Sequence, residues 1–235
     1  WGELDAGLDE ALTGGTAATG WHGCYTANRR VSFTPDVSHM LSRFLEEIRS
    51  ALGTKSAPRA VHRTVNGIDV ALTNTRAEIS DEDVFRRMGE VLAMIERYAP
   101  ARMRRLRRDL AGIDVKRFAC RAAFFSESRR ALLELTFMVN PSFGIAEIAS
   151  SLLHEGVHAR VHAMDVLRTP DALAKEERLC RRTELWWGRT VPNGERVVER
   201  ALASLALPDQ AVAPEIDWAE AARRVSQADR ASRGD

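Results

Sequence analysis

The sequence contains 235 residues, of which 45% are hydrophobic and 29% are charged, and its 34 basic and 33 acidic residues give a net charge of +1. This composition excludes a chain that is disordered throughout, and the balanced charge provides no overall field that would attract nucleic acid or a membrane surface. No apolar run approaches the roughly 20 residues that a helix needs to cross a bilayer. We therefore expect no membrane partner, and we regard nucleic acid as an unfavoured one.

A chain of this length corresponds to one large domain or two small ones, at about 100–200 residues per domain. We predict a single domain over 1–235, with an irregular N-terminal arm (1–35), a lobe of helices and sheet (36–140) and a helical lobe (141–235). The three widely spaced cysteines predict no disulfide framework, which favours a reducing, cytoplasmic location. Because the sequence starts at Trp1 rather than Met, an upstream targeting segment stays an open alternative.

The first predicted elements are a helix and a hairpin. Apolar residues recur at helical spacing over 36–52. Two strands, 59–65 and 68–74, then flank the pair Asn66-Gly67, which favours the positive φ angles of a tight turn. A two-stranded hairpin is therefore expected here.

A longer helix follows, because Ser80 and Asp83 form a capping-box pattern in front of an apolar stripe that continues to about residue 98. A basic helix to about residue 112 is expected after Pro100. Two strands, 113–126 and 130–139, come next. The rest of the chain is predicted to be helical, over 145–166, 171–188, 194–206 and 215–231. Strands followed by helices indicate an α+β fold.

The strongest chemical signal is a His-Glu-x-x-His pattern formed by His154, Glu155 and His158. Residues four apart lie on one face of a helix, so both imidazoles can bind one zinc ion from successive turns. Glu155 projects beside them, where it can reach a metal-bound water. Apolar neighbours predict that this helix is buried, and buried histidines need a partner such as a dication. We therefore predict a site for one zinc ion, with Glu155 as the catalytic residue.

A catalytic zinc usually has three protein ligands and one open position. His162 continues the row of the motif's histidines, but on an unbroken helix it lies roughly 12 Å from His154, too far to share one ion. The metzincin pattern needs a helix-breaking Gly where this sequence has Val161. Asp165 is one residue out of register with the related aspartate pattern. These residues are therefore excluded as the third ligand by spacing.

The distance from the motif to Glu177 gives His-Glu-x-x-His-x18-Glu, and residues 135–188 thereby resemble the zinc metallopeptidases called gluzincins. The resemblance implies that Glu177, on a second helix, is the third zinc ligand, with Glu176 as the alternative after a small shift of register. It implies a zincin-like α+β fold, with a small mixed or antiparallel sheet lobe before a helical lobe that carries the active-site helix. It also implies cleavage of peptide bonds in a peptide or protein substrate. No subfamily is indicated.

Several roles follow from this resemblance. Zinc activates a water, and Glu155 accepts its proton and delivers it to the leaving nitrogen. A donor must stabilise the oxyanion, and the candidates are His162, Arg181 and Arg182. The acids available to orient the ligating histidines are Asp165 and Glu184. The sequence does not indicate the residues that bind substrate.

The segment 132–139, directly before the motif, has two interpretations. By analogy with the family it is an edge strand to which an extended substrate can add; alternatively it is an ordinary core strand. Trp186 and Trp187 are interpreted as core residues.

A competing hypothesis starts from residues 97–130, which hold 11 basic and 3 acidic residues. We interpret this segment first as a solvated helix face, since no recognised nucleic-acid fold accompanies it. The alternative is a non-catalytic, zinc-containing binding module whose Arg-rich segment recognises an acidic partner or nucleic acid. The sequence indicates no oligomeric state.

Overall fold

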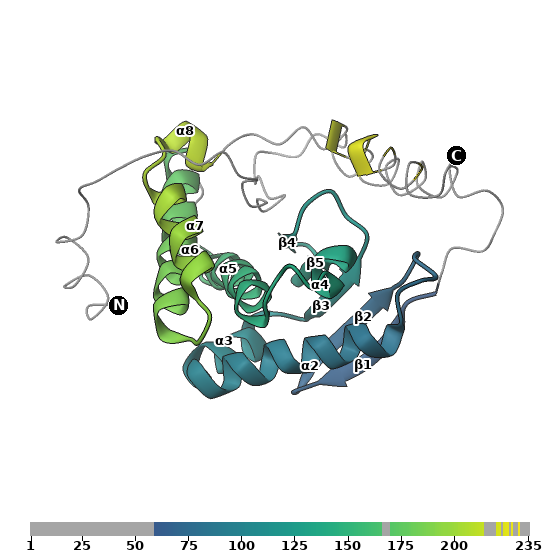
Figure 1. Cartoon of the computed structure of the whole chain (residues 1–235). Coiled ribbons are helices and arrows are strands. Elements are labelled where there is room, and N and C mark those ends of the chain that lie inside the picture. The colour runs from purple at the N-terminus through teal and green to yellow at the C-terminus, as the bar shows by residue number, and fades with distance from the viewer. Residues whose placement is uncertain are drawn as a thin grey trace.

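The computed structural model describes residues 59–165 and 170–213, together with residues 220, 221, 223–225, 227 and 230 near the C-terminus. The predicted arm over 1–35 and the predicted helix over 36–52 lie outside the described residues, and so does most of the predicted helix over 215–231. The described chain has the α+β architecture expected from the sequence, with a five-stranded mixed sheet followed by a mainly helical region (Figure 1).

The sheet has the strand order β1-β2-β3-β5-β4. Its strands are β1 (Val61–Val65), β2 (Ile68–Thr73), β3 (Gly112–Lys116), β4 (Ala122–Phe125) and β5 (Arg130–Glu134). The three inner strands run parallel, whereas β1 and β4 pair antiparallel at the two edges. The helices are α2 (Asp81–Tyr98), α3 (Pro100–Asp109), α4 (Leu135–Val139), α5 (Ile145–Ala163), α6 (Pro170–Thr190), α7 (Glu195–Leu205) and α8 (Asp209–Val212).

The predicted hairpin is confirmed. Asn66 and Gly67 connect β1 and β2 with φ angles of 46° and 77°, the conformation that this pair tolerates at low cost. The helix predicted from residue 80 is also confirmed as α2, with Ser80 at its N-cap. However, the Ser80 side chain makes no capping hydrogen bond, so the predicted capping box is wrong, and three acidic residues in the first turn favour the helix start instead.

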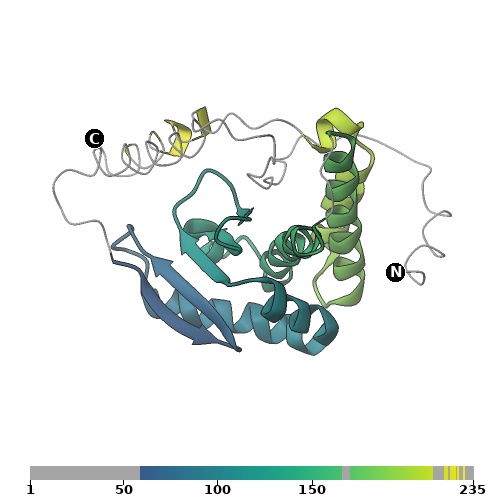
Figure 2. The ribbon, with the colours of Figure 1, turned by 180° about the vertical axis from the view of Figure 1, so that it is seen from behind.

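The helices form two layers beside the sheet. In one layer, α2 packs against β1 and α5 packs against β4 and β5, and the two helices contact each other. In the second layer, α6 and α7 lie side by side on the far side of α5 from the sheet (Figures 1 and 2). Helix α5 is therefore enclosed between the sheet and α6, which explains why almost its whole length is buried.

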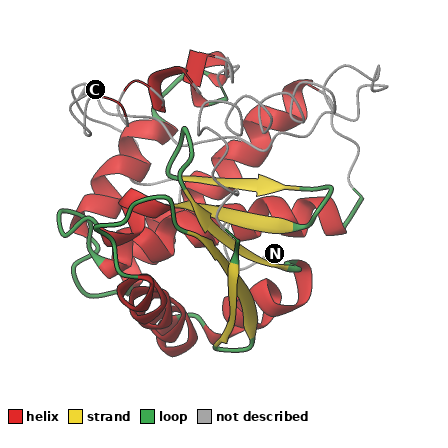
Figure 3. Ribbon diagram, turned by 90° about the vertical axis from the view of Figure 1, so that its right-hand side faces the viewer, coloured by secondary structure: helices red, strands yellow, loops and turns green. Residues whose placement is uncertain are grey.

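The apolar core lies mainly between α2 and the sheet. The inner face of α2 presents five fully buried side chains, which are Val84, Met88, Val91, Leu92 and Ile95. Their spacing of three and four residues places them along one stripe of the helix. They pack in one cluster with Val70, Ile113 and Leu133 from the inner strands. Figure 3 shows the strands in yellow, with the helices lying behind and beside them.

Gly156, inside the His-Glu-x-x-His motif, makes room for a close approach between helices. A Cβ at this position would lie 2.4 Å from Cδ2 of Leu106 in α3. Because atoms cannot approach so closely, a side chain at this position would force the Leu106 side chain to shift. Trp187 fixes the other side of α5: it is fully buried and donates from Nε1 to the carbonyl of Ala146 at 2.9 Å. Trp187 is thus a core residue, as predicted.

Two strand predictions differ from the structure. The segment 113–126 forms two strands rather than one, because β3 runs parallel to β5 and β4 runs antiparallel to it, so the chain reverses between them. The predicted strand over 130–139 ends at Glu134. The buried Glu134 carboxylate accepts from the backbone N–H of Phe137 at 2.7 Å and so caps the short helix α4. Because β5 lies between β3 and β4, it is an inner strand, and the edge interpretation of 132–139 is wrong.

Candidate metal centre

The His-Glu-x-x-His motif lies in the middle of α5 and faces α6. Helix α5 begins after Gly144, whose backbone N–H donates to the Glu147 carboxylate at 3.0 Å. His154 and His158 are one turn apart and lie on the same helix face, as the spacing predicts, and their side chains are 3% and 1% exposed. Since α6 covers this face, every polar group here must find its partner within the protein.

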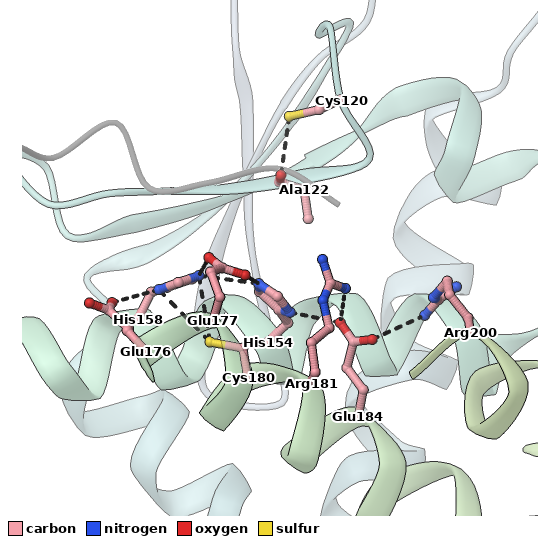
Figure 4. Close-up of polar contacts among 10 residues, drawn as sticks. All are labelled: Cys120, Ala122, His154, His158, Glu176, Glu177, Cys180, Arg181, Glu184 and Arg200. Carbon is pink, nitrogen blue, oxygen red and sulfur yellow. Dashed lines mark hydrogen bonds and ion pairs between the residues drawn. The ribbon is translucent and has the colours of Figure 1, made fainter. Parts of the chain in front are cut away.

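Two carboxylates of α6 hold the histidine rings in one orientation. Nδ1 of His154 lies 2.7 Å from Oε1 of Glu184, and Nδ1 of His158 lies 2.6 Å from Oε1 of Glu176 (Figure 4). The hydrogen-bond network assigns a proton to each Nδ1, because a carboxylate can only accept. In neutral imidazoles this leaves the two Nε2 atoms with lone pairs, and these atoms lie only 3.1 Å apart. Two lone pairs at this distance repel each other unless a proton or a metal ion lies between or beside them.

Glu177 faces the same two nitrogens. Its Oε1 lies 3.0 Å from Nε2 of His158, and its Oε2 lies 3.4 Å from Nε2 of His154. Neither oxygen accepts a hydrogen bond from the residues that the structure describes, although Glu177 is only 1% exposed. A buried carboxylate without donors is costly unless a cation neutralises it. The structure therefore places the predicted third ligand against the predicted pair.

Cys180 completes the group. It is a free cysteine, fully buried one turn after Glu177 in α6. Its Sγ lies 3.6 Å from Nε2 and 3.9 Å from Nδ1 of His158. The ligand atoms of His154, His158 and Cys180 all lie within 4.8 Å of one another, so this buried group could hold a metal ion.

The donor set fits zinc. Nitrogen and sulfur are preferred zinc ligands, and two nitrogens on one tetrahedral zinc lie about 3.3 Å apart. The observed Nε2–Nε2 distance of 3.1 Å is close to this value. The carboxylates on the Nδ1 atoms match the usual support of zinc-binding histidines, in which a carboxylate fixes the tautomer and the ring orientation.

Electrostatics around the histidines also favour a cation. Burial acts to lower the pKa of His154 and His158, but the neighbouring Cys180 and Glu177 outweigh it, and both pKa values lie well above the ordinary value. Burial likewise acts to raise the pKa of Glu177, but the two histidines hold it far below its usual range. The pocket therefore attracts positive charge, which protons or a metal ion can supply in competition.

Glu155 differs from the other acids of the site. It is 1% exposed, and its Oε2 accepts no hydrogen bond from any described residue. Burial raises its pKa to about 7, despite the opposing effect of His154 and His158. A carboxyl group whose pKa lies near neutrality can both accept and release a proton there.

The other predicted site residues divide into two sets. Arg181 and Glu184 belong to the centre: Nη1 of Arg181 donates to Oε1 of Glu184 at 2.9 Å, and both are buried. His162 lies further along α5, where its ring approaches that of Phe124 in β4, with centroids 5.9 Å apart. Asp165 lies beyond the end of α5 and is exposed. Of the two acids predicted to orient the histidines, the structure brings only Glu184 to a ring.

Sequence reasoning missed two features of the centre. Glu176, considered as an alternative metal ligand, instead contacts Nδ1 of His158, and Cys180 was not included at all. The signal for Cys180 was present, because residues three apart on a helix share a face, and Glu177 and Cys180 have this spacing.

The Arg-rich segment 97–130 is largely occupied by contacts within the protein. The Arg102 guanidinium lies 4.5 Å from the ring centroid of Trp186, and Arg107 pairs with Glu96 at 2.5 Å. Arg130 contacts Asp69 at 2.9 Å and Asp114 at 2.6 Å. These contacts leave fewer basic side chains of the segment 97–130 available to bind an external acidic partner.

No helix in the part of the chain that the structure describes is both long enough and apolar enough to span a bilayer. In comparisons with known proteins, no family model matches the chain, and no curated protein and no solved structure matches it either.

Proposed function

We propose that the protein is a zinc-dependent peptidase in which His154, His158 and Glu177 hold the zinc ion and Glu155 is the general base. One observation carries the proposal: carboxylates on both Nδ1 atoms turn the two Nε2 atoms toward each other at 3.1 Å, opposite a Glu177 carboxylate that accepts no hydrogen bond from the described residues. This is the arrangement of a three-ligand zinc site with its supporting carboxylates.

When bound here, a zinc ion lowers the pKa of a bound water and polarises a substrate carbonyl. The chain's own residues supply the rest. Glu155 accepts the proton of the attacking water and passes it to the leaving nitrogen, for which its pKa of about 7 is well placed. Arg181 and Glu184 hold His154 in its ring orientation. The donor for the oxyanion stays open among the predicted candidates His162, Arg181 and Arg182.

A peptide substrate suits the edge of the sheet. Strand β4 is the outermost strand on its side of the described sheet, and it packs against α5. An extended peptide can add to such an edge through backbone hydrogen bonds. Phe124 of β4 touches His162 of α5, which places the strand beside the motif helix. We therefore assign to β4 the substrate-binding role that the sequence suggested for 132–139.

The test combines metal content with activity. Protein purified without added zinc is expected to contain about one zinc per chain by mass spectrometry, and Glu177→Ala is expected to lose most of it. Glu155→Gln should keep the zinc but lower cleavage of a peptide library by about 100-fold or more. Glu90→Gln, on the exposed face of α2, is the matched control and should keep both. A Glu155→Gln protein that cleaves peptides at the wild-type rate would refute the proposal.

A second candidate function is a non-catalytic zinc module, and Cys180 is the observation that favours it. Nitrogen and sulfur ligands on one tetrahedral zinc lie about 3.6 Å apart, which is the distance between Cys180 Sγ and His158 Nε2. A fourth protein ligand would close the position that water needs. Cobalt substitution separates the two candidates, because a bound thiolate gives a sulfur-to-cobalt charge-transfer band. If that band is present in the wild type and absent in Cys180→Ser, and Glu177→Ala also loses most of its metal, four protein ligands close the site.

A further inference from the structure

Arginines from three parts of the fold gather around the N-terminal half of α5, next to the metal centre. One precedes β4, one lies in α6 and two lie in α7; we name them the arginine cluster, which consists of Arg121, Arg181, Arg196 and Arg200. Two carboxylates, Glu147 and Glu184, lie among them. The cluster thus combines four positive and two negative charges, an excess of two positive charges.

Glu184 connects the cluster to the metal centre. Its Oε1 binds Nδ1 of His154 at 2.7 Å and Nη1 of Arg181 at 2.9 Å, and its Oε2 lies 3.9 Å from Nη2 of Arg200. Figure 4 shows His154, Arg181, Glu184 and Arg200 in this order along the α5–α6 interface. The cluster therefore begins directly beside His154, on the side away from His158.

Glu147 neutralises part of the cluster at its other end. Its Oε2 lies 3.3 Å from Nη1 of Arg196 and also accepts from the backbone N–H of Gly144. Arg196 donates in addition to the carbonyl of Ser142 at 2.7 Å. Both carboxylates of the region are thus paired with arginines of the cluster other than Arg121.

Arg121 has no such neutralisation. Its guanidinium lies 4.6 Å from the ring centroid of Phe143 and 5.5 Å from that of Phe137, and no carboxylate of the described residues lies within ion-pair distance of it. Burial lowers its pKa, with Arg200 and Arg196 acting in the same direction and Glu147 and Glu184 only partly opposing them. Arg121 is thus a half-buried cation in a region that already has an excess of positive charge.

This arrangement suits a carboxylate ligand. A guanidinium held against an aromatic ring loses little freedom on binding, and its N–H edge matches the two oxygens of a carboxylate. We infer that the arginine cluster, with Arg121 and Arg200 as its main donors, binds a substrate carboxylate close to the bond that is cleaved. The substrate class is therefore a peptide with an acidic side chain or a free C-terminal carboxylate at that position. This inference rests on the proposed peptidase function.

The test measures how fast the zinc-loaded protein cleaves three sets of hexapeptides, which differ in their acidic residue and in whether the C-terminus is amidated or free. The first set carries one Glu and an amidated C-terminus, the second has a free C-terminus and no acidic residue, and the third is amidated and carries Gln in place of Glu. Cleavage of the first or the second set should exceed that of the third by about tenfold or more, and the faster set identifies the source of the carboxylate. Arg121→Gln should remove the preference, and Arg121→Lys should restore it in part.

Arg104→Gln, an exposed position on α3, is the matched control and should keep the preference. If Arg121→Gln does not fold, as judged by its melting curve, Arg200→Gln provides the second variant. Equal cleavage of all three sets by the wild type would overturn the inference while leaving the peptidase proposal intact.

A binding measurement distinguishes a failure of the peptidase proposal from a failure of the carboxylate site. The zinc-loaded Glu155→Gln protein is titrated with fluorescently labelled members of the three sets, and anisotropy reports the affinity without turnover. If no set is cleaved by the wild type but the carboxylate-bearing peptides bind about tenfold more tightly than the neutral ones, the peptidase proposal fails and the carboxylate site stands. Equal binding of all three sets overturns the carboxylate site.

Discussion

Two helix interfaces of this protein have opposite chemistry. Helix α2 covers the sheet with aliphatic side chains such as Met88 and Leu92, whereas α5 and α6 meet through histidines, carboxylates and an arginine. The α2 interface gains free energy from the removal of apolar surface from water. The α5–α6 interface costs desolvation energy that its charges must recover from one another or from a bound cation. The difference separates a part of the fold that is stabilised by apolar burial from a part whose buried polar groups could hold a metal ion.

Metal removal is the test with the largest expected effect on stability, and it acts on the α5–α6 interface alone. If zinc binds at the α5–α6 interface, a free zinc concentration about 1,000 times the dissociation constant stabilises the fold by about 4 kcal/mol. We expect a chelator to lower the melting temperature by several degrees and zinc to restore it, both measured by calorimetry. A melting temperature that does not respond to the chelator would mean that the ionised interface is stable without a metal.

Truncation inside the apolar interface should have a comparable effect by a different mechanism. Met88→Ala is expected to lower the free energy of unfolding by about 3 kcal/mol, within the usual range for a buried side chain, because Met88 is fully buried against the sheet. Urea unfolding measures the loss. The zinc content per folded chain should stay unchanged; a loss of zinc would show that the two interfaces are not independent.

Acid should weaken the α5–α6 interface selectively. The pKa of Glu184 is about 2, because Arg181 and His154 outweigh the effect of burial. Its folded pKa is below the ordinary value of 4.5, so its contribution to stability is complete above about pH 5 and is lost as the pH falls toward 2. We expect up to about 3 kcal/mol of pH-dependent stability from this group. Urea unfolding of the metal-free protein between pH 5 and pH 2 measures it, and Glu184→Gln should show a smaller slope.

The carboxylates that orient the histidines should affect metal affinity more than folding. Glu176→Gln is expected to weaken zinc binding by about 10- to 100-fold, because the contact of Glu176 with Nδ1 of His158 fixes the ring. Competition with a zinc-chelating dye measures the affinity. Wild-type affinity in this variant would show that the ring orientation does not depend on Glu176.

Removal of a surface charge is expected to have the smallest effect on stability. Glu90 pairs with Arg86 at 2.7 Å on the exposed side of α2, and such pairs add little to stability because solvent screens them. Glu90→Gln should therefore shift the urea midpoint only slightly and leave the zinc content unchanged. A loss of more than about 1 kcal/mol in the free energy of unfolding would contradict this expectation. It would mean that exposure to solvent does not explain why surface charges and the buried charges of α5–α6 differ in their effect on stability.

Local patterns were sufficient for most helices and for the hairpin. The Asn66-Gly67 turn and the apolar stripes of α2 and α5 depend on neighbours in sequence, so the sequence predicts them directly. The end of β5 at Glu134 could not be predicted in this way, because it depends on a buried carboxylate that caps α4. The order of the strands depends on contacts between distant segments, which is why the edge position of β4 could not be read from the sequence.

The same distinction applies to the candidate site. The spacing of His154 and His158 along one helix was enough to bring them to one face, with Glu155 beside them. The contribution of α6 depends on how two helices pack, and a rotation of α6 by one residue would exchange Glu176 and Glu177. Glu176 and Glu184 are both about 2.6–2.7 Å from their histidines, and only the packed structure shows which acid reaches which nitrogen.

The packing at Gly156 limits which sequences can have this architecture. Because Leu106 occupies the space of a side chain at position 156, the two variable positions of the His-Glu-x-x-His motif are not equivalent. A chain with a larger residue at position 156 would need a different rotamer of Leu106, a smaller residue at position 106 or a displaced α3. Distant relatives with this packing should therefore show His-Glu-Gly-x-His, or a pair of compensating changes at positions 106 and 156, and this linked pattern is a more selective search criterion than the motif alone.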